Sequence, residues 1–411
     1  ILNRMKTKNP EAGYIPDIVP WMKRLLPVTV PKGIKMITDA GGANPVQAAI
    51  EVEKVIKELN VGPMKIGVVS GDDILPYIDE IRAQGWKFKN LDTGEEDIDS
   101  IRDRIVAANA YIGADLIVKE LKNGADMIIT GRASDNALYV GPLMHEFGWD
   151  FTDKYTDLIA AAVTVGHIIE CSACVSGGMS NMWRVSERPW EIGFPIAEFY
   201  ENGEAVITKT PGSGGIVNQW TVKEHLLYEI MDPANYMMPD GIGDFTRIQL
   251  IEEERNRVRV KNMGGKKRPD TLKVCIGFRD GFIGEGMVFF PWPDALEKAK
   301  WAEKWVRERF KKLGVNFREL RIDYVGVNML HGEAAPVEDK DLNEVGLRIA
   351  ARTDNYKEAE LVRREATHLW TMGPIGSSFG VPLNVRPVIA LWPSLVPRDA
   401  VRIESQLMEV S

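Results

Sequence analysis

Three short apolar segments in the first third of the chain are each followed by a polar loop and then by a helix-like pattern. The apolar segments are residues 34–38, 65–69 and 127–130, and the amphipathic stretches behind them are residues 46–59, 74–84 and 137–147. Nearly continuous apolar strands that alternate with amphipathic helices are typical of a parallel sheet with helices on both faces. The pattern therefore predicts an α/β fold with a Rossmann-like parallel sheet in residues 1–150.

The rest of the chain predicts a different arrangement. Residues 151–270 contain two helix patterns, at 157–170 and 217–230, and we interpret them as a middle segment that completes a cleft. The basic cluster at 261–268 is interpreted as a linker. Residues 271–411 then predict an α+β domain, with strands at 272–278, 282–290 and 320–327 and a helix at 294–312. Asp280-Gly281, between the first two strands, predicts a hairpin turn.

Composition narrows the classes of function. The 51 basic and 59 acidic residues give a net charge of −8, which argues against a nucleic-acid partner because phosphate contacts need a basic surface. Cys171, Cys174 and Cys275 imply no disulfide framework and favour a cytoplasmic protein. No apolar run reaches the ~20 residues of a membrane helix, so no membrane partner is expected. The first residue is not Met, and we expect a fragment whose start is missing.

The loops after the apolar segments predict a ligand site, because ligands bind at the carboxyl ends of parallel strands. Gly41 and Gly42 allow a close backbone approach, with free N–H groups from the following helix for an anion. The polar residues of the three loops are Asp39, Asn44, Asp72, Asp73, Arg132 and Asp135. Ordinary helix capping and turn formation are the alternative for each loop. The loops contain neither a dinucleotide fingerprint nor a P-loop, so NAD and ATP are not expected and the cofactor is unknown.

A second group follows in the middle segment. His167, Glu170 and Cys171 share one face of the predicted helix, where they could supply a general base with an orienting carboxylate or ligate a metal. Buried packing is the alternative for Cys171 and Cys174. We predict proton transfer by Asp73, Asp135, His167 and Glu170. The predicted substrate-binding residues are Asp39, Gly41, Gly42, Asn44, Asp72, Arg132, Gly177 and Gly178.

Several of these motifs resemble those of the acyclic terpene utilisation (AtuA-like) family. They include Asp39-Ala-Gly-Gly-Ala-Asn-Pro45, Ile129-Thr-Gly-Arg-Ala-Ser-Asp135 and Gly166-His-Ile-Ile-Glu-Cys171, and the likeness extends to Pro397-Arg398. The resemblance implies a part in the catabolism of branched acyclic acids and their acyl-CoA esters. Some members carry a small extra C-terminal domain, and others work with a small separate subunit.

Two departures from the family pattern matter. Family members begin with a further strand and glycine-rich loop that this chain lacks at its start. Where the family has Glu-Cys-Gly-Ala-Gln-Val-Thr-Gly-Gly, this chain has Glu170-Cys-Ser-Ala-Cys-Val-Ser-Gly-Gly178, which puts a substrate contact there in doubt. The chain ends at Ser411 without the extra domain, and this favours a small partner subunit. A homo-oligomer is also expected, with or without that second subunit.

The resemblance and the side chains together favour an enzyme, a lyase or hydratase acting on a branched carboxylate or its acyl-CoA ester. Such a reaction needs a placed base, a placed acid and stabilisation of an enolate-like intermediate. The alternative is a non-catalytic ligand-binding or scaffolding subunit of a larger complex, which an exposed apolar strip on the C-terminal sheet would favour. Metal-dependent hydrolysis is a third hypothesis, if His167, Glu170 and Cys171 converge with another acid.

Overall fold

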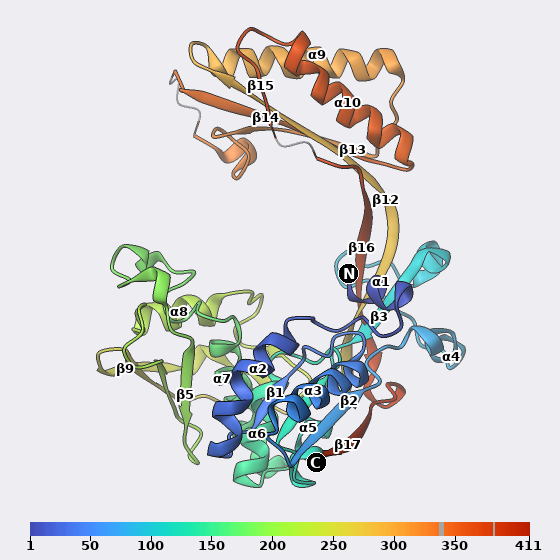
Figure 1. The fold of residues 1–411 in the computed structure, drawn as a ribbon. Helices are drawn as coiled ribbons and strands as arrows, with labels where there is room; N and C mark the ends of the chain where they lie inside the picture. Colours follow the sequence, from blue (N-terminus) through green and yellow to red (C-terminus); the bar gives the residue numbers. More distant parts are fainter. Residues whose placement is uncertain (337–340, 381–382) are drawn as a thin grey trace. The chain divides into compact units, whose positions relative to one another are not determined.

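The computed structural model describes residues 1–336, 341–380 and 383–411. The chain separates into two compact units (Figure 1). Unit 1 contains Ile1–Ser100, Ala107–Ile276 and Pro393–Ser411, and unit 2 contains Ile101–Val106 and Gly277–Trp392. Strands β3 (Ile105–Ala110), β12 (Thr271–Pro291) and β16 (Arg386–Pro397) each run from one unit into the other. This grouping does not test which segments would fold alone, so the ranges 1–150, 151–270 and 271–411 stay predictions as domains.

The first sheet of unit 1 contains parallel strands. Its order is β1 (Met36–Thr38), β4 (Met127–Thr130), β2 (Met64–Ser70) and β17 (Glu404–Val410), with β17 antiparallel to β2. Helices α2 (Ile18–Thr29) and α3 (Pro45–Leu59) share a core with Ile66 and Val68 of β2. Gly67 points the other way, towards Glu120 of α5 (Asp115–Lys122). The predicted α/β class with parallel strands is confirmed.

Helices α6 (Ala137–Phe147) and α7 (Thr156–Glu170) continue from α5 as closely packed neighbours. Gly141 of α6 lies against Ile117 of α5, and Gly166 of α7 lies against Asn136, just before α6. A side chain at either glycine would meet the neighbouring helix. This close packing brings the end of the β4 loop next to α7.

The remaining strands of unit 1 form two small antiparallel sheets. One has the order β5 (Pro195–Phe199), β6 (Ala205–Lys209), β10 (Arg257–Lys261) and β9 (Gln249–Glu254). Its core is shared with α7 and with α8 (Gln219–Leu227). The other contains β11 (Gly265–Lys266), β8 (Ile242–Gly243) and β7 (Tyr236–Met237), and it contacts α7.

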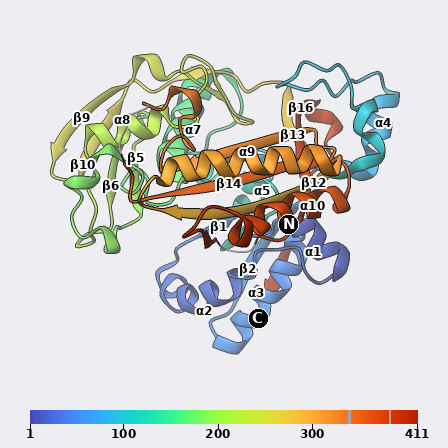
Figure 2. The same cartoon turned by 90° about the horizontal axis from the view of Figure 1, so that it is seen from above.

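Unit 2 is a sheet covered on one face by two helices. The order is β13 (Glu319–Val325), β14 (Glu344–Thr353), β12 and β15 (Ser378–Phe379), and β3 and β16 also pair with β12. Figures 1 and 2 show α9 (Ala295–Leu313) and α10 (Tyr356–Met372) on the same face of the sheet. Val288, Leu347 and Val306 belong to the core beneath them. The opposite face carries charged side chains such as Arg348, which contacts Glu285 and Asp323.

Three expectations from the sequence are wrong. Residues 271–291 form one continuous strand, β12, in place of two strands joined by a hairpin at Asp280-Gly281. Residues 261–268 do not form a linker, because Gly265–Lys266 pairs with β8 inside unit 1. The helix expected at 217–230 is shorter, since Asn218 caps its start through Thr221 N–H and Tyr228 is already extended.

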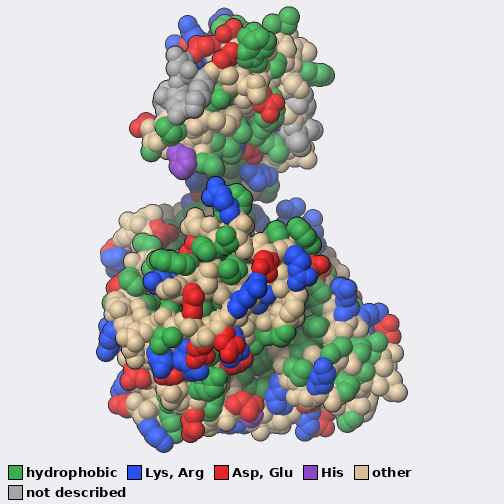
Figure 3. Space-filling view, turned by 90° about the vertical axis from the view of Figure 1, so that its left-hand side faces the viewer, with side chains coloured by type: hydrophobic (Ala, Val, Ile, Leu, Met, Phe, Trp, Pro, Cys, Tyr) green, Lys and Arg blue, Asp and Glu red, His purple; other side chains and the backbone are tan. Residues whose placement is uncertain are grey.

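Short helices connect the larger elements. The 3-10 helices are η1 (Val30–Lys32), η2 (Leu75–Tyr77), η3 (Ile98–Arg104), η4 (Asp153–Tyr155), η5 (Asn181–Arg184), η6 (Pro189–Glu191), η7 (Phe245–Arg247), η8 (Gly332–Ala334) and η9 (Arg398–Ala400), and the remaining α-helices are α1 (Leu2–Lys8) and α4 (Ile78–Ala83). Among the described residues, no helix combines the length and apolarity needed to cross a membrane. Figure 3 shows basic and acidic side chains interspersed on the face it presents, with hydrophobic side chains between them.

Candidate functional site

The three loops predicted to bind a ligand meet at one edge of the first sheet. They follow β1, β4 and β2, which are adjacent and parallel. A Cβ atom at Gly41 would collide with the Thr130 carbonyl oxygen, and one at Gly131 would collide with the Asp72 carboxylate. The loops therefore touch through glycines, and the expectation that they share one edge is met.

The loop around Gly41 and Gly42 is covered by the N-terminal segment. The N–H groups of Gly42, Ala43 and Asn44 donate to Asp39, Gly13 and Gly41 carbonyl oxygens at 2.8–3.0 Å. The Asn44 amide donates to the carbonyl oxygens of Pro10 and Ala12 at 2.9 Å, and it makes no side-chain cap on α3. These groups hold the loop and the N-terminal segment together. A ligand-binding role for Gly41, Gly42 and Asn44 stays a prediction.

The adjacent carboxylates Asp72 and Asp73 have different surroundings. Asp72 is buried and accepts a hydrogen bond from Asn109 Nδ2 at 2.8 Å. Burial raises the pKa of Asp72, and the charge of Asp73 adds to this effect. Asp73 is exposed and accepts from the Leu75 N–H at 3.0 Å, as a turn cap. Asp72 is therefore the inward group of the pair, and the catalytic role predicted for Asp73 stays a prediction.

Arg132 and Asp135 lie close together in the loop after β4. The Arg132 guanidinium stacks over the Tyr111 ring at 4.3 Å from the ring centroid. Burial raises the pKa of the Asp135 carboxyl, and the charges of Asp39 and Glu170 raise it further against the effect of Arg132. The coupling to Asp39 and Glu170 shows that the β1 loop and the end of α7 belong to the same neighbourhood.

His167 is buried in a polar and aromatic setting. Its Nδ1 lies 3.3 Å from Tyr236 Oη, which donates to Asn136 Oδ1 at 3.3 Å. Its Nε2 has no hydrogen-bond partner among the described residues. Burial, with the neighbouring His225, lowers the pKa of His167 to about 4. The ring is therefore neutral at neutral pH, with one nitrogen held by Tyr236.

Glu170 ends α7 and lies between His225 and Cys171. His225 Nε2 lies 3.8 Å from Glu170 Oε1, and the two histidine rings lie 5.4 Å apart. Burial raises the pKa of Glu170, but His225 and Cys171 lower it more, so it lies below its usual value. Burial beside Glu170 raises the pKa of the Cys171 thiol to about 12. Glu170 is thus an ionised carboxylate and Cys171 a neutral thiol.

Tyr139 links the two predicted groups, and the sequence did not single it out. Burial and the charges of Glu170, Asp135 and Asp39 raise its pKa to about 12. Tyr139 lies in the first turn of α6, four residues after Asp135, which is in the turn before that helix. His225, Tyr236 and Tyr111 were also missed. Spacing could have pointed to Tyr139, but the others come from distant segments.

Gly177 and Gly178 belong to the turns that follow α7. Gly177 has a φ of +97° and lies against the backbone of Ile216, and Gly178 donates its N–H to Ala173 at 2.9 Å. Chain packing explains both glycines. Their predicted contact with a substrate stays a prediction.

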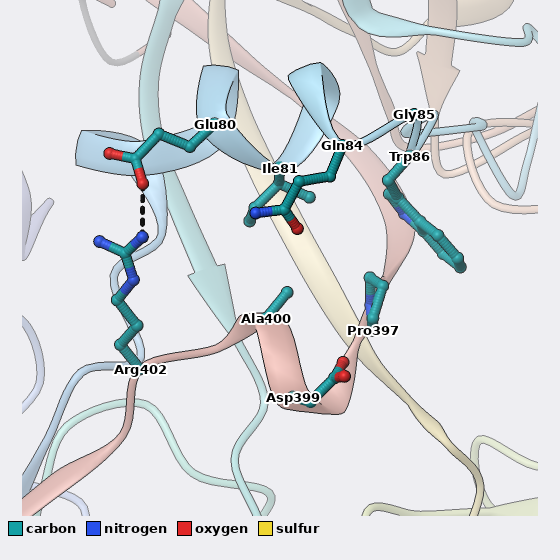
Figure 4. A pocket seen from close by; sticks show the side chains of 9 residues that line it. All are labelled: Glu80, Ile81, Gln84, Gly85, Trp86, Pro397, Asp399, Ala400 and Arg402. Atoms are coloured by element: carbon teal, nitrogen blue, oxygen red, sulfur yellow. Dashed lines mark hydrogen bonds and ion pairs between the residues drawn. The ribbon is translucent and has the colours of Figure 1, made fainter.

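Two surface pockets lie in unit 1, and neither is lined by a predicted site residue. One, of 420 Å³, is lined by residues of α4 and of η9. Figure 4 shows Gln84 and Trp86 facing Pro397 and Asp399 across it, with Glu80 paired to Arg402. The other, of 490 Å³, lies between α8 and β9.

The metal hypothesis has no geometric support in the part of the chain that the structure describes. No group of three or more His, Cys, Asp or Glu residues there is arranged to hold a metal ion. His167 and Glu170 lie on α7, and Cys171 follows its end. Among the described residues, no additional acidic side chain completes a metal-binding group with these three.

The candidate site combines groups of different proton affinity. An ionised glutamate and an aspartate with a raised pKa lie around Tyr139, and a buried neutral histidine precedes that glutamate by one turn of α7. The aspartate also neighbours an arginine that stacks on a tyrosine. No curated protein and no solved structure matches the chain. The family model described as acyclic terpene utilisation family protein AtuA matches residues 1–407. The chain therefore belongs to the acyclic terpene utilisation family, whose role is catabolic.

Proposed function

We propose that this chain is an enzyme that adds water to, or removes it from, a branched acyclic carboxylate or its acyl-CoA ester. The observation that carries the proposal is the pair of carboxyl groups whose pKa values are moved apart. The pKa of Asp135 is raised and that of Glu170 is lowered. Environments that separate two titratable groups in this way suit one as acid and the other as base.

In the hydration direction, Glu170 removes a proton from water, whose oxygen bonds to the β-carbon of an α,β-unsaturated substrate. The C=C electron pair moves towards the carbonyl, and Asp135 delivers a proton to the α-carbon. Arg132 stabilises the negative charge that develops on the carbonyl oxygen. Dehydration runs through the same steps in reverse. In this proposal the parallel strands carry Asp135 and Arg132 at their carboxyl edge, as in a Rossmann-like arrangement, and Glu170 is supplied by the end of α7.

His167 is proposed to act through its free Nε2. Asn136 donates its Nδ2 to the Val163 carbonyl oxygen at 2.7 Å, so its Oδ1 faces Tyr236. The Tyr236 hydroxyl then donates to Asn136 and accepts from the Nδ1–H of His167. This leaves Nε2 of His167 unprotonated, as a second acceptor beside Glu170.

The proposal is tested with geranoyl-CoA as a branched, unsaturated substrate. Loss of enoyl absorbance and the mass of the product would report water addition. Glu170→Gln is expected to lower kcat by about 100-fold or more, because the amide cannot take a proton. Glu146→Gln, at an exposed position on α6, is the matched control. No turnover by the unaltered protein in either direction, or an unchanged rate in Glu170→Gln, would contradict the proposal.

The second candidate is a non-catalytic subunit, and a specific surface favours it. Trp183, Trp190 and Phe194 are 60–79% exposed within one short segment of unit 1. Large exposed apolar side chains mark contact surfaces. In this case the chain would bind a small second subunit or a further copy of itself, and the reaction would take place in the assembled complex.

A further inference from the structure

The groove between α8 and β9 lies in unit 1 and has a largely apolar lining. Both elements are labelled in Figure 1. Its floor includes Leu226 and Leu250, which belong to the core shared with α7. Ile251 and Leu227, 44% and 68% exposed, line its sides. The volume of 490 Å³ falls in the range of about 300–1,000 Å³ that is typical of ligand sites.

One end of the groove adjoins the candidate site. Phe245 lines the groove, and its ring stacks on His167 at 5.7 Å between centroids with an interplanar angle of 23°. At the far end, the N–H of Gln219 donates to Glu252 Oε1 at 2.9 Å. Helix α8 has 9 residues and so gives the groove a length of about 12 Å.

Helix α8 lies between the groove and the ionisable groups His225 and Glu170. Leu226 points into the groove, whereas the neighbouring His225 contacts Glu170 on the other side. Lys223 places its ammonium over the Trp220 ring, 4.9 Å from the centroid, and leaves its apolar stem along the groove. The surface that the groove offers is therefore mainly apolar.

We propose that this groove binds the acyclic, methyl-branched hydrocarbon chain of the substrate, a proposal that rests on the function proposed above. The chain lies along α8, with its reacting end towards Phe245 and the His167 side. An open, largely apolar groove suits a flexible chain, and the family's role in acyclic terpene utilisation supplies ligands of this class. The groove would then recognise the hydrocarbon chain of the substrate, and a separate part of the site would recognise its carboxylate or thioester.

The test compares the binding of citronellate, citronellyl-CoA and butyryl-CoA by calorimetry. Ile251→Trp fills the groove and is expected to weaken binding of the two branched ligands by about tenfold or more, while butyryl-CoA binding stays unchanged. Ile196→Trp is the matched control, since Ile196 lies in the same sheet and is 40% exposed. Leu227→Asp provides a second variant at an exposed position, with the same expected loss.

The outcomes separate this inference from the proposed reaction. If Ile251→Trp and Leu227→Asp bind the branched ligands as tightly as the unaltered protein, or if that protein binds neither ligand, the groove is not the chain site. If the branched ligands bind in a groove-dependent way but geranoyl-CoA is not turned over, the groove stands and the hydratase proposal fails. If geranoyl-CoA is turned over equally well by both variants, the hydratase proposal stands and the groove does not bind the chain.

Discussion

At the scale of single residues, the site depends on how burial and neighbouring charges change proton affinity. His167 and Glu170 share a helix end, yet burial makes one neutral while partners keep the other ionised. Asp135, in the loop after β4, holds its proton to higher pH. These differences come from surroundings that the side-chain types alone do not specify.

Asp240 shows the same effect away from the site and yields a prediction about stability. It is 2% exposed, accepts from the Ala114 N–H at 2.8 Å through Oδ1, and has no partner for Oδ2 among the described residues. Burial raises its pKa from 3.8 to about 7. The folded state therefore binds this proton more tightly than the unfolded state. The resulting cost in stability is absent below pH ~4, grows as the pH rises to about 7, and stays constant above that.

Asp240→Asn removes this titration while keeping an oxygen for the Ala114 N–H. Between about pH 5 and pH 8, the unaltered protein is expected to lose roughly 2–3 kcal/mol of stability relative to the variant, because the loss of about 1.4 kcal/mol per pH unit continues up to about pH 7. Urea unfolding at both pH values measures this difference. Asp17→Asn, at an exposed position, controls for the change of residue type. Parallel pH dependences for the variant and the unaltered protein would show that Asp240 is ionised in the folded state.

At the scale of elements, close contacts at glycines fix how helices lie on their neighbours. Gly286 of β12 lies under α10, and an added Cβ would be 2.5 Å from Ala366 Cβ. The helix can approach the sheet this closely only because strand and helix both present small residues. The two positions should therefore be coupled in energy.

The double-mutant cycle of Gly286→Ala and Ala366→Gly tests that coupling. Gly286→Ala is expected to lower stability by about 1–3 kcal/mol through overpacking. Ala366→Gly removes the atom that it meets, so the double variant should lose less than the sum of the two single losses, by about 0.5–3 kcal/mol. Urea unfolding gives the three free energies. Additive losses would mean that the helix shifts to accommodate the methyl group.

The elements themselves follow the sequence unevenly. The predicted strand 127–130 and helix 137–147 coincide with β4 and α6, because a run of buried residues and a capped amphipathic pattern are local signals. The hairpin predicted at Asp280-Gly281 was wrong. Turn-forming residues are a local signal, and they do not show that the strand continues beyond Gly281 and pairs with β14 from Phe282 onwards. Gly281 has a φ of +81° and meets the Thr353 carbonyl oxygen, so it serves close strand pairing.

At the scale of the whole molecule, the sequence located the neighbourhood of the site but not all its members. Parallel strands place their carboxyl ends together, and this principle brought Asp39, Arg132 and Asp135 to one edge. His225 and Tyr236, which contact Glu170 and His167, come from segments more than fifty residues later in the chain. No local sequence pattern predicts that these distant segments come into contact. For the same reason, the sequence did not predict that the N-terminal segment covers Gly41 and Gly42.

The central claim is that the groups around His167, Glu170 and Asp135 transfer protons to and from a branched acyl substrate. The most direct measurement is the uptake of deuterium from D₂O at the α-carbon of citronellyl-CoA, followed by mass spectrometry. We predict exchange by the unaltered protein and by Asp17→Asn, a change at an exposed aspartate away from the site. Asp135→Asn should slow exchange by about 100-fold or more, because Asp135 is the group proposed to transfer the α-carbon proton. Equal exchange in Asp135→Asn, or none in the unaltered protein, would contradict the claim.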